Sequence, residues 1–151
     1  MADTRCQTEC ERWVRDVWLA DQFGQRFSER NVTLTSGGQF KFDAVSADGS
    51  ILASISTSRA AMSSGKRGVG KLMKLRADML FHMLAAAPRK LMVFTEPCMY
   101  QACSSEQVRG RTPQDIEFVL VQLPPELATK LAASRDRSSR EVRPTAVEPS
   151  A

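Results

Sequence analysis

The segment KLMVFTEP, residues 90–97, limits the fold more than any other part of this chain. It is a short, nearly continuous apolar run that ends at Pro97. Such a run is typical of a strand that is buried on both faces, and strands of this kind occur in sheets that helices cover on both sides. We therefore expect an α/β protein with a central sheet.

The rest of the chain supplies the other elements of this sheet. Residues 3–27 carry apolar side chains at helical spacing and predict an amphipathic first helix. Residues 31–58 alternate in polarity around turn signals at Gly37-Gly38 and Asp48-Gly49, and so predict two or three antiparallel strands. A helix over 69–87, a strand over 116–123 and a short helix opened by prolines complete the order α-β-β-β-α-β-β-α, with a mixed sheet of about five strands.

The chain of 151 residues is expected to form one domain over residues 1–133. Residues 134–151 lack apolar periodicity and predict a loose C-terminal tail. No apolar run approaches the roughly 20 residues that span a bilayer, and the N-terminus is charged. These features predict a cytoplasmic protein without a membrane segment.

The chain has four cysteines, at positions 6, 10, 98 and 103, and one histidine, His82, as possible zinc ligands. None of the cysteine pairs has the C-x-x-C spacing that makes a zinc site specific. The spacing favours free, partly buried thiols in a reducing compartment over a zinc site.

The stretch SSGKRGVGKLMK, residues 63–74, combines glycines with cations. From Gly65 to Lys71 it matches most of the phosphate-loop pattern, but Leu72 stands where a magnesium-binding Ser or Thr belongs. We interpret it as a cationic entry to a helix and as a patch that attracts anions. A solvated helix face is the alternative.

Asp43 lies on the second predicted strand, and alternation on the third predicted strand turns Ser54 and Ser56 to one face. Asp43 is therefore expected to face these two serines. With the element order, this arrangement resembles the restriction-endonuclease-like superfamily of PD-(D/E)XK nucleases over residues 3–123. In that family, acids on the second and third strands bind magnesium, and a lysine two residues after the second acid helps to activate water. Asp43 matches the first acid, while Ser54 and Ser56 stand in place of the second acid and the lysine.

This departure from the family motif predicts a degenerate catalytic centre. Hydroxyl groups supply neither the charge nor the oxygen geometry that holds magnesium, and Ser56 cannot stabilise charge on a phosphate as lysine does. Displaced groups are the alternative: Glu9, Glu11 or Glu96 as acids, and Lys71 or Lys74 as the cation. The expected cofactor is none, or Mg²⁺ if these groups restore activity. In the simplest case Asp43 only pairs with Lys41 or with a turn amide.

The resemblance also places the loop and helix after the third strand beside the nucleic-acid cleft of the family. The residues that would then grip a phosphate backbone are Lys66, Arg67, Gly68, Lys71 and Lys74. No aromatic residue interrupts this patch, so binding should tolerate any base sequence.

Three functional hypotheses follow. The first is a nucleic-acid-binding domain without cleavage activity. The second is an active Mg²⁺-dependent nuclease that uses Asp43 with displaced partners. The third is a protein-interaction module whose basic loop binds an acidic partner. The sequence is also compatible with a symmetric homodimer.

Overall fold

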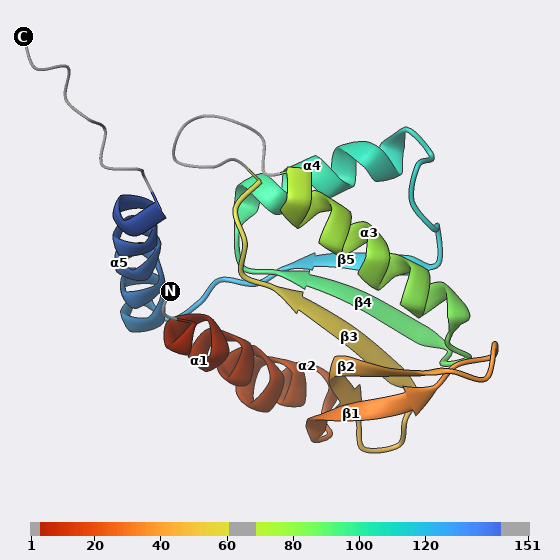
Figure 1. Ribbon diagram of the computed structural model, residues 1–151. Coiled ribbons are helices and arrows are strands. Elements are labelled where there is room, and N and C mark those ends of the chain that lie inside the picture. Colours follow the sequence, from red (N-terminus) through yellow and green to blue (C-terminus); the bar gives the residue numbers. More distant parts are fainter. Residues whose placement is uncertain (1–3, 61–68, 143–151) are drawn as a thin grey trace, which may run out of the picture.

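The computed structural model describes residues 4–60 and 69–142 of the chain. A five-stranded mixed sheet lies at its centre, and helices cover both faces (Figure 1). The strand order is β1-β2-β3-β4-β5, with the first three strands antiparallel and the last three parallel. The expected α/β architecture with a five-stranded mixed sheet is confirmed.

The helical and strand segments follow one another in chain order as α1 (Arg5–Trp13), the π-helix η1 (Val14–Leu19), α2 (Ala20–Phe23), β1 (Phe27–Thr33), β2 (Gln39–Ser46), β3 (Ile51–Ser56), α3 (Val69–Leu84), β4 (Arg89–Phe94), α4 (Pro97–Val108), β5 (Ile116–Leu120) and α5 (Pro125–Val142).

The strand β4 separates two apolar cores, as its continuous apolar sequence predicts. Leu91 and Val93 pack with residues of α1, η1 and α5 on one face of the sheet. Met92 and Phe94 pack with residues of α3 and α4 on the other face. Because all four side chains are fully buried, β4 is the central strand between the two helical layers.

The β2–β3 hairpin turns at the Asp48-Gly49 pair, as expected. Gly49 has a φ of 74°, which a residue with a side chain rarely adopts. The Asp48 carboxylate accepts hydrogen bonds from the Ser46 hydroxyl at 2.8 Å and from the Ser50 amide at 3.0 Å. These contacts fix the turn, and with it the strand that leads to the candidate site.

The strands β2 and β3 pair only near this turn. Their register joins Ala44 to Ala53 and Val45 to Leu52, whereas the rest of β3 pairs with β4 alone. A bulge also interrupts the pairing of β1 with β2 between Ser28 and Arg30. The sheet therefore opens between β2 and β3 at the end of β3 that is farther from the hairpin.

Two predicted boundaries and one helix differ from the structure. The first helical segment ends at Phe23, because Gly24 takes a left-handed conformation with φ 66°, and β1 already begins at Phe27. The helix α4, which the predicted order omits, connects the parallel strands β4 and β5. Such a connection is needed because parallel strands cannot be joined by a tight turn.

The helix α5 continues through Val142, beyond the predicted domain boundary at residue 133. The segment 134–142 is therefore helical, and not the loose tail that its sequence suggests. Residues 143–151 lie outside the described residues. Among the helices in the described ranges, none has the length and apolar character required to cross a membrane.

Candidate functional site

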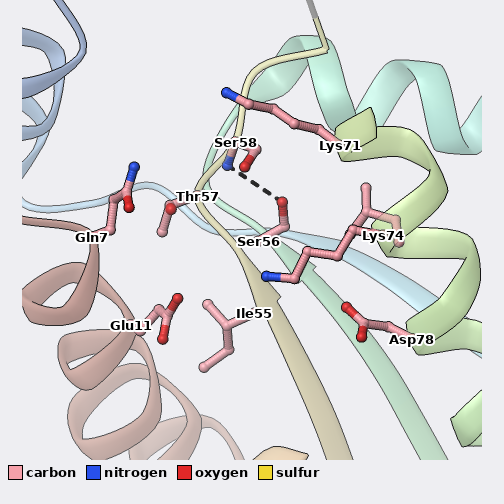
Figure 2. A pocket seen from close by; sticks show the side chains of 10 residues that line it. Gln7, Glu11, Ile55, Ser56, Thr57, Ser58, Lys71, Lys74 and Asp78 are labelled. Carbon is pink, nitrogen blue, oxygen red and sulfur yellow. Dashed lines mark hydrogen bonds between the residues drawn. The ribbon is translucent and has the colours of Figure 1, made fainter. Parts of the chain in front are cut away.

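A pocket of about 90 Å³ lies at the carboxyl end of β3, between α1 and α3 (Figure 2). Its lining comes from three places: Gln7 and Glu11 of α1, the strand end Ile55, Ser56, Thr57 and Ser58, and Lys71, Lys74, Leu75 and Asp78 of α3. The carboxyl ends of the strands in open α/β sheets are common ligand sites. The pocket therefore lies at a position where open α/β sheets commonly bind ligands.

Hydroxyl groups form the floor of this pocket. Ser56 and Thr57 are buried, with 8% and 6% of their surface exposed, and Ser58 follows them. The carbonyl oxygen of Ser56 accepts a hydrogen bond from the Thr95 amide at 3.0 Å, which ties the end of β3 to the end of β4. The three hydroxyl-bearing residues are therefore held on a fixed strand end.

Two lysines enter from α3. Lys71 and Lys74 are three residues apart and so share a helix face, while the buried Leu75 anchors the helix to the sheet. In Figure 2, Lys74 reaches from α3 across the end of β3, and Lys71 extends toward Ser58. Both ammonium groups therefore stand beside the hydroxyl-lined floor.

Two carboxylates also line the pocket: Glu11 on α1, opposite the lysines, and Asp78 on α3, beside Lys74 (Figure 2). Burial, and then the charge of Asp43, raise the pKa of Glu11 to about 7. The same two causes, in the same order, raise the pKa of Asp78 to about 6. Lys74 opposes both shifts, so this lysine lies in the electrostatic field of both acids.

Asp43 stands next to this group, where β2 and β3 separate. Its Oδ2 accepts a hydrogen bond from the Ile55 amide at 2.8 Å, and Arg15 donates to its carbonyl oxygen at 3.4 Å. Burial raises the pKa of Asp43, while the Ile55 amide and Lys74 lower it. Where β2 and β3 separate, the Ile55 amide has no backbone acceptor on β2. The Asp43 carboxylate accepts its hydrogen bond instead.

Some of the predicted site residues line the pocket and others do not. Ser56, Glu11, Lys71 and Lys74 line the pocket. Ser54 does not, because it is 3% exposed and its hydroxyl lies 2.9 Å from His82 Nε2. The expectation that Asp43 faces the two serines stays a prediction, since its carboxylate accepts a hydrogen bond from the backbone amide of Ile55, the residue between them. Lys66, Arg67 and Gly68 lie outside the described residues.

The other candidate acids have partners elsewhere. Glu9 pairs with Lys130 of α5 at 3.7 Å. Glu96 forms an ion pair with Arg135 of α5 and approaches Arg59 at 3.8 Å. Lys41 pairs with Glu29 at 2.8 Å, so it is not the partner of Asp43. Of the proposed displaced acids, only Glu11 faces the pocket.

Asp78 is the ionisable pocket residue that the sequence analysis missed; the polar residues Gln7, Thr57 and Ser58 were not singled out either. It lies four residues after Lys74 and seven after Lys71, so all three share one face of α3. This helical spacing is visible in the sequence and would have indicated an acid beside the two lysines.

The residues that the structure describes do not form a metal site. Within residues 4–60 and 69–142, no group of three or more His, Cys, Asp or Glu side chains is arranged to hold a metal ion. The Ile55 amide already occupies one Asp43 oxygen. The four cysteines are free thiols, of which Cys10 and Cys103 are buried. The site therefore offers ammonium and hydroxyl donors beside carboxylate acceptors, and its described residues do not supply a set of ligands for magnesium.

Comparisons with known proteins found no matching family model, no similar curated protein and no similar solved structure. The pocket and the topology around it are therefore the features that indicate a function.

Proposed function

We propose that this chain is a nucleic-acid-binding domain of the restriction-endonuclease-like type that binds the phosphate backbone without cleaving it. The observation that carries this proposal is the position of Lys71 and Lys74 above the hydroxyl-bearing end of β3.

The two lysines and the hydroxyl groups at the end of β3 suit a phosphate group. Ammonium and hydroxyl groups are hydrogen-bond donors, and lysines that neutralise phosphates gain affinity from the release of counterions. The N-terminal half of α3 carries both lysines, at the helix end that favours anions. None of the residues that line the pocket is aromatic, which supports binding that does not depend on base sequence.

The topology supports the family part of the proposal. An N-terminal helix, three antiparallel strands, a helix and a parallel strand follow one another in the expected order, and Asp43 lies where β2 and β3 separate. The absence of cleavage is supported by Ser54, which is packed in the core, and by the lack of a metal-binding group among the described residues.

Binding can be measured by fluorescence anisotropy with labelled oligonucleotides of several unrelated sequences, in salt from about 50 to 200 mM. Wild-type protein should bind all sequences similarly and lose affinity steeply with salt. The double variant Lys71→Glu/Lys74→Glu should bind at least about tenfold more weakly. Arg109→Glu reverses one exposed charge at the end of α4, away from the pocket, and should change the affinity less than either Lys71→Glu or Lys74→Glu alone. Equal affinities for wild type and the double variant would overturn the proposal.

A second candidate is metal-dependent cleavage of nucleic acid. The observation that favours it is that Glu11, Asp43 and Asp78 share the field of Lys74, so acids and a lysine do gather near the pocket. Incubation with plasmid, linear and single-stranded substrates in Mg²⁺ or Mn²⁺ tests it. Cutting that Asp43→Asn abolishes would establish this activity and contradict the non-cleaving proposal. If the protein binds no nucleic acid, the third hypothesis applies: Lys71 and Lys74 would then bind an acidic protein partner.

A further inference from the structure

We propose that the pocket prefers RNA to DNA, because the carboxylates of Glu11 and Asp78 can accept a hydrogen bond from a ribose 2′-hydroxyl beside the bound phosphate. This inference rests on the proposed function, since it assumes that a nucleic-acid backbone enters the pocket.

The first observation is that the pocket combines hydrogen-bond donors with acceptors, and that Asp78 lies on the same face of α3 as the two lysines while Glu11 faces them from α1 (Figure 2). Lys71, Lys74 and the hydroxyls at the end of β3 offer hydrogen-bond donors to a phosphate. Glu11 on α1 and Asp78 on α3 offer only acceptors when they are ionised. A ligand that satisfies the whole pocket must therefore carry an anionic group and a donor close to each other.

The second observation is that both carboxylates lack a hydrogen-bonding partner within the described chain. Their surroundings act on them through burial and through the charges of Asp43 and Lys74, and neither forms a hydrogen bond or ion pair with another described residue. Asp43 differs, because the Ile55 amide already binds one of its oxygens. Partial burial disfavours the charged forms of both carboxylates, and a hydrogen-bond donor from a ligand would stabilise those charges.

The backbone chemistry of the two nucleic acids then decides the preference. The sugar–phosphate backbone of DNA presents only acceptors, which would leave Glu11 and Asp78 without a donor and close to a phosphate. The 2′-hydroxyl of RNA is both donor and acceptor, and it is the group that lets a protein distinguish the two polymers. None of the described residues that line the pocket is aromatic, so the contacts available there are to the sugar and the phosphate.

The test compares single-stranded RNA, DNA and 2′-O-methyl RNA of one sequence at pH 8 and constant salt. RNA should bind about tenfold more tightly than DNA, the effect of one hydrogen bond to a charged group. Methylation removes the donor, so 2′-O-methyl RNA should bind like DNA. Because this comparison uses the wild-type protein, it decides the question even if a variant fails to fold.

Variants then locate the effect. Glu11→Ala and Asp78→Ala should each reduce the ratio of RNA to DNA affinity, and Glu11→Gln, which keeps an acceptor oxygen, should retain more of it than Glu11→Ala. Asp21→Asn, an exposed change on α2, is the control and should leave the ratio unaltered.

The outcomes separate this inference from the proposed function. Equal affinities for RNA and DNA, both lost in Lys71→Glu/Lys74→Glu, would overturn the RNA preference and leave backbone binding intact. Tighter binding of DNA, or of 2′-O-methyl RNA at the level of RNA, would also overturn it. Binding to none of the three polymers would overturn the proposed function and this inference with it.

Discussion

The hydroxyl of Ser54 lies 2.9 Å from Nε2 of His82, and both side chains are buried against the inner face of α3. His82 also meets the ring of Phe42 edge-on, at 5.0 Å between ring centroids. Its other nitrogen, Nδ1, has no hydrogen-bond partner in the described structure. Ser54 is therefore a structural partner of a core histidine, although the sequence analysis expected it at the position of a catalytic acid.

Replacing Ser54 should affect stability and leave binding intact. Ser54→Ala would remove the remaining hydrogen bond of His82, and a buried polar group without a partner costs about 1–3 kcal/mol. Urea unfolding at pH 7 should show this loss. The affinity for nucleic acid should stay within about twofold of wild type, because Ser54 does not line the pocket. A large loss of affinity in a folded Ser54→Ala protein would contradict this assignment.

His82 should also make the fold sensitive to acid. Burial first, and then the charge of Lys90, lower its pKa from 6.5 to about 4. Because the unfolded chain binds this proton at a higher pH than the folded chain, stability falls as the pH drops from 6.5 toward 4. Between pH 7 and 5 the loss should be about 2 kcal/mol. Urea unfolding at both pH values should show a smaller loss in His82→Gln, and equal losses would contradict the explanation.

Local sequence signals predicted the central part of the fold. The apolar run of β4 and the Asp48-Gly49 turn correctly located the buried strand and the β2–β3 hairpin. The helix α4 was missed because only Met99 and Cys103 are buried in it, so its apolar residues form no continuous stripe. The parallel pairing that requires such a crossover is a tertiary property, and the strand sequences alone do not reveal it.

The site was predicted in part, and the errors have a geometric cause. Alternation along β3 correctly separated Ile55 from Ser54 and Ser56, since Ile55 packs in the core on the α1 side. The position of Asp43 could not be predicted, because a bulge shifts the register of β2 and the strands separate after Ala53. A bulge changes which side chains face one another without leaving a clear sequence signal.

Glu11 should reduce the stability of the protein at high pH. Burial and the charge of Asp43 raise its pKa from 4.5 to about 7, so the folded chain binds this proton more tightly than the unfolded chain. The associated stability is complete below about pH 4.5 and is lost as the pH rises through 7. Glu11→Gln should therefore be more stable than wild type at pH 8, on the order of 1 kcal/mol, with little difference at pH 4.5.

Glu9→Gln is the matched control for Glu11→Gln in urea unfolding. Glu9 lies two residues away on α1, but it is exposed and pairs with Lys130 at 3.7 Å. It should show no gain in stability at pH 8. If Glu11→Gln also gains nothing at pH 8, then Glu11 is not held in an unfavourable charged state.

Arg135 joins α5 to the floor of the pocket, and its removal should destabilise the protein. Its guanidinium donates to the Glu96 carboxylate and to the carbonyl oxygen of Thr57, a residue of the pocket floor. Arg135→Ala would leave a partly buried carboxylate and carbonyl without this donor, at a cost of about 2–4 kcal/mol. Arg135→Lys keeps the charge but not the two-pronged geometry, so thermal unfolding should place it between Arg135→Ala and wild type. Wild-type stability in Arg135→Ala would contradict the connection.

The pH dependence of binding follows from the acids of the pocket. Glu11 and Asp78, with pKa values of about 7 and 6, lose charge as the pH falls from 8 to 6. Less negative charge then faces a bound phosphate, so the affinity for DNA should rise severalfold, as measured by anisotropy at constant salt. His82, with a pKa of about 4, does not titrate in this range. Glu11→Gln removes the group of higher pKa and should flatten the rise between pH 8 and 7. A rise as steep as that of wild type in this variant would exclude Glu11 as its source.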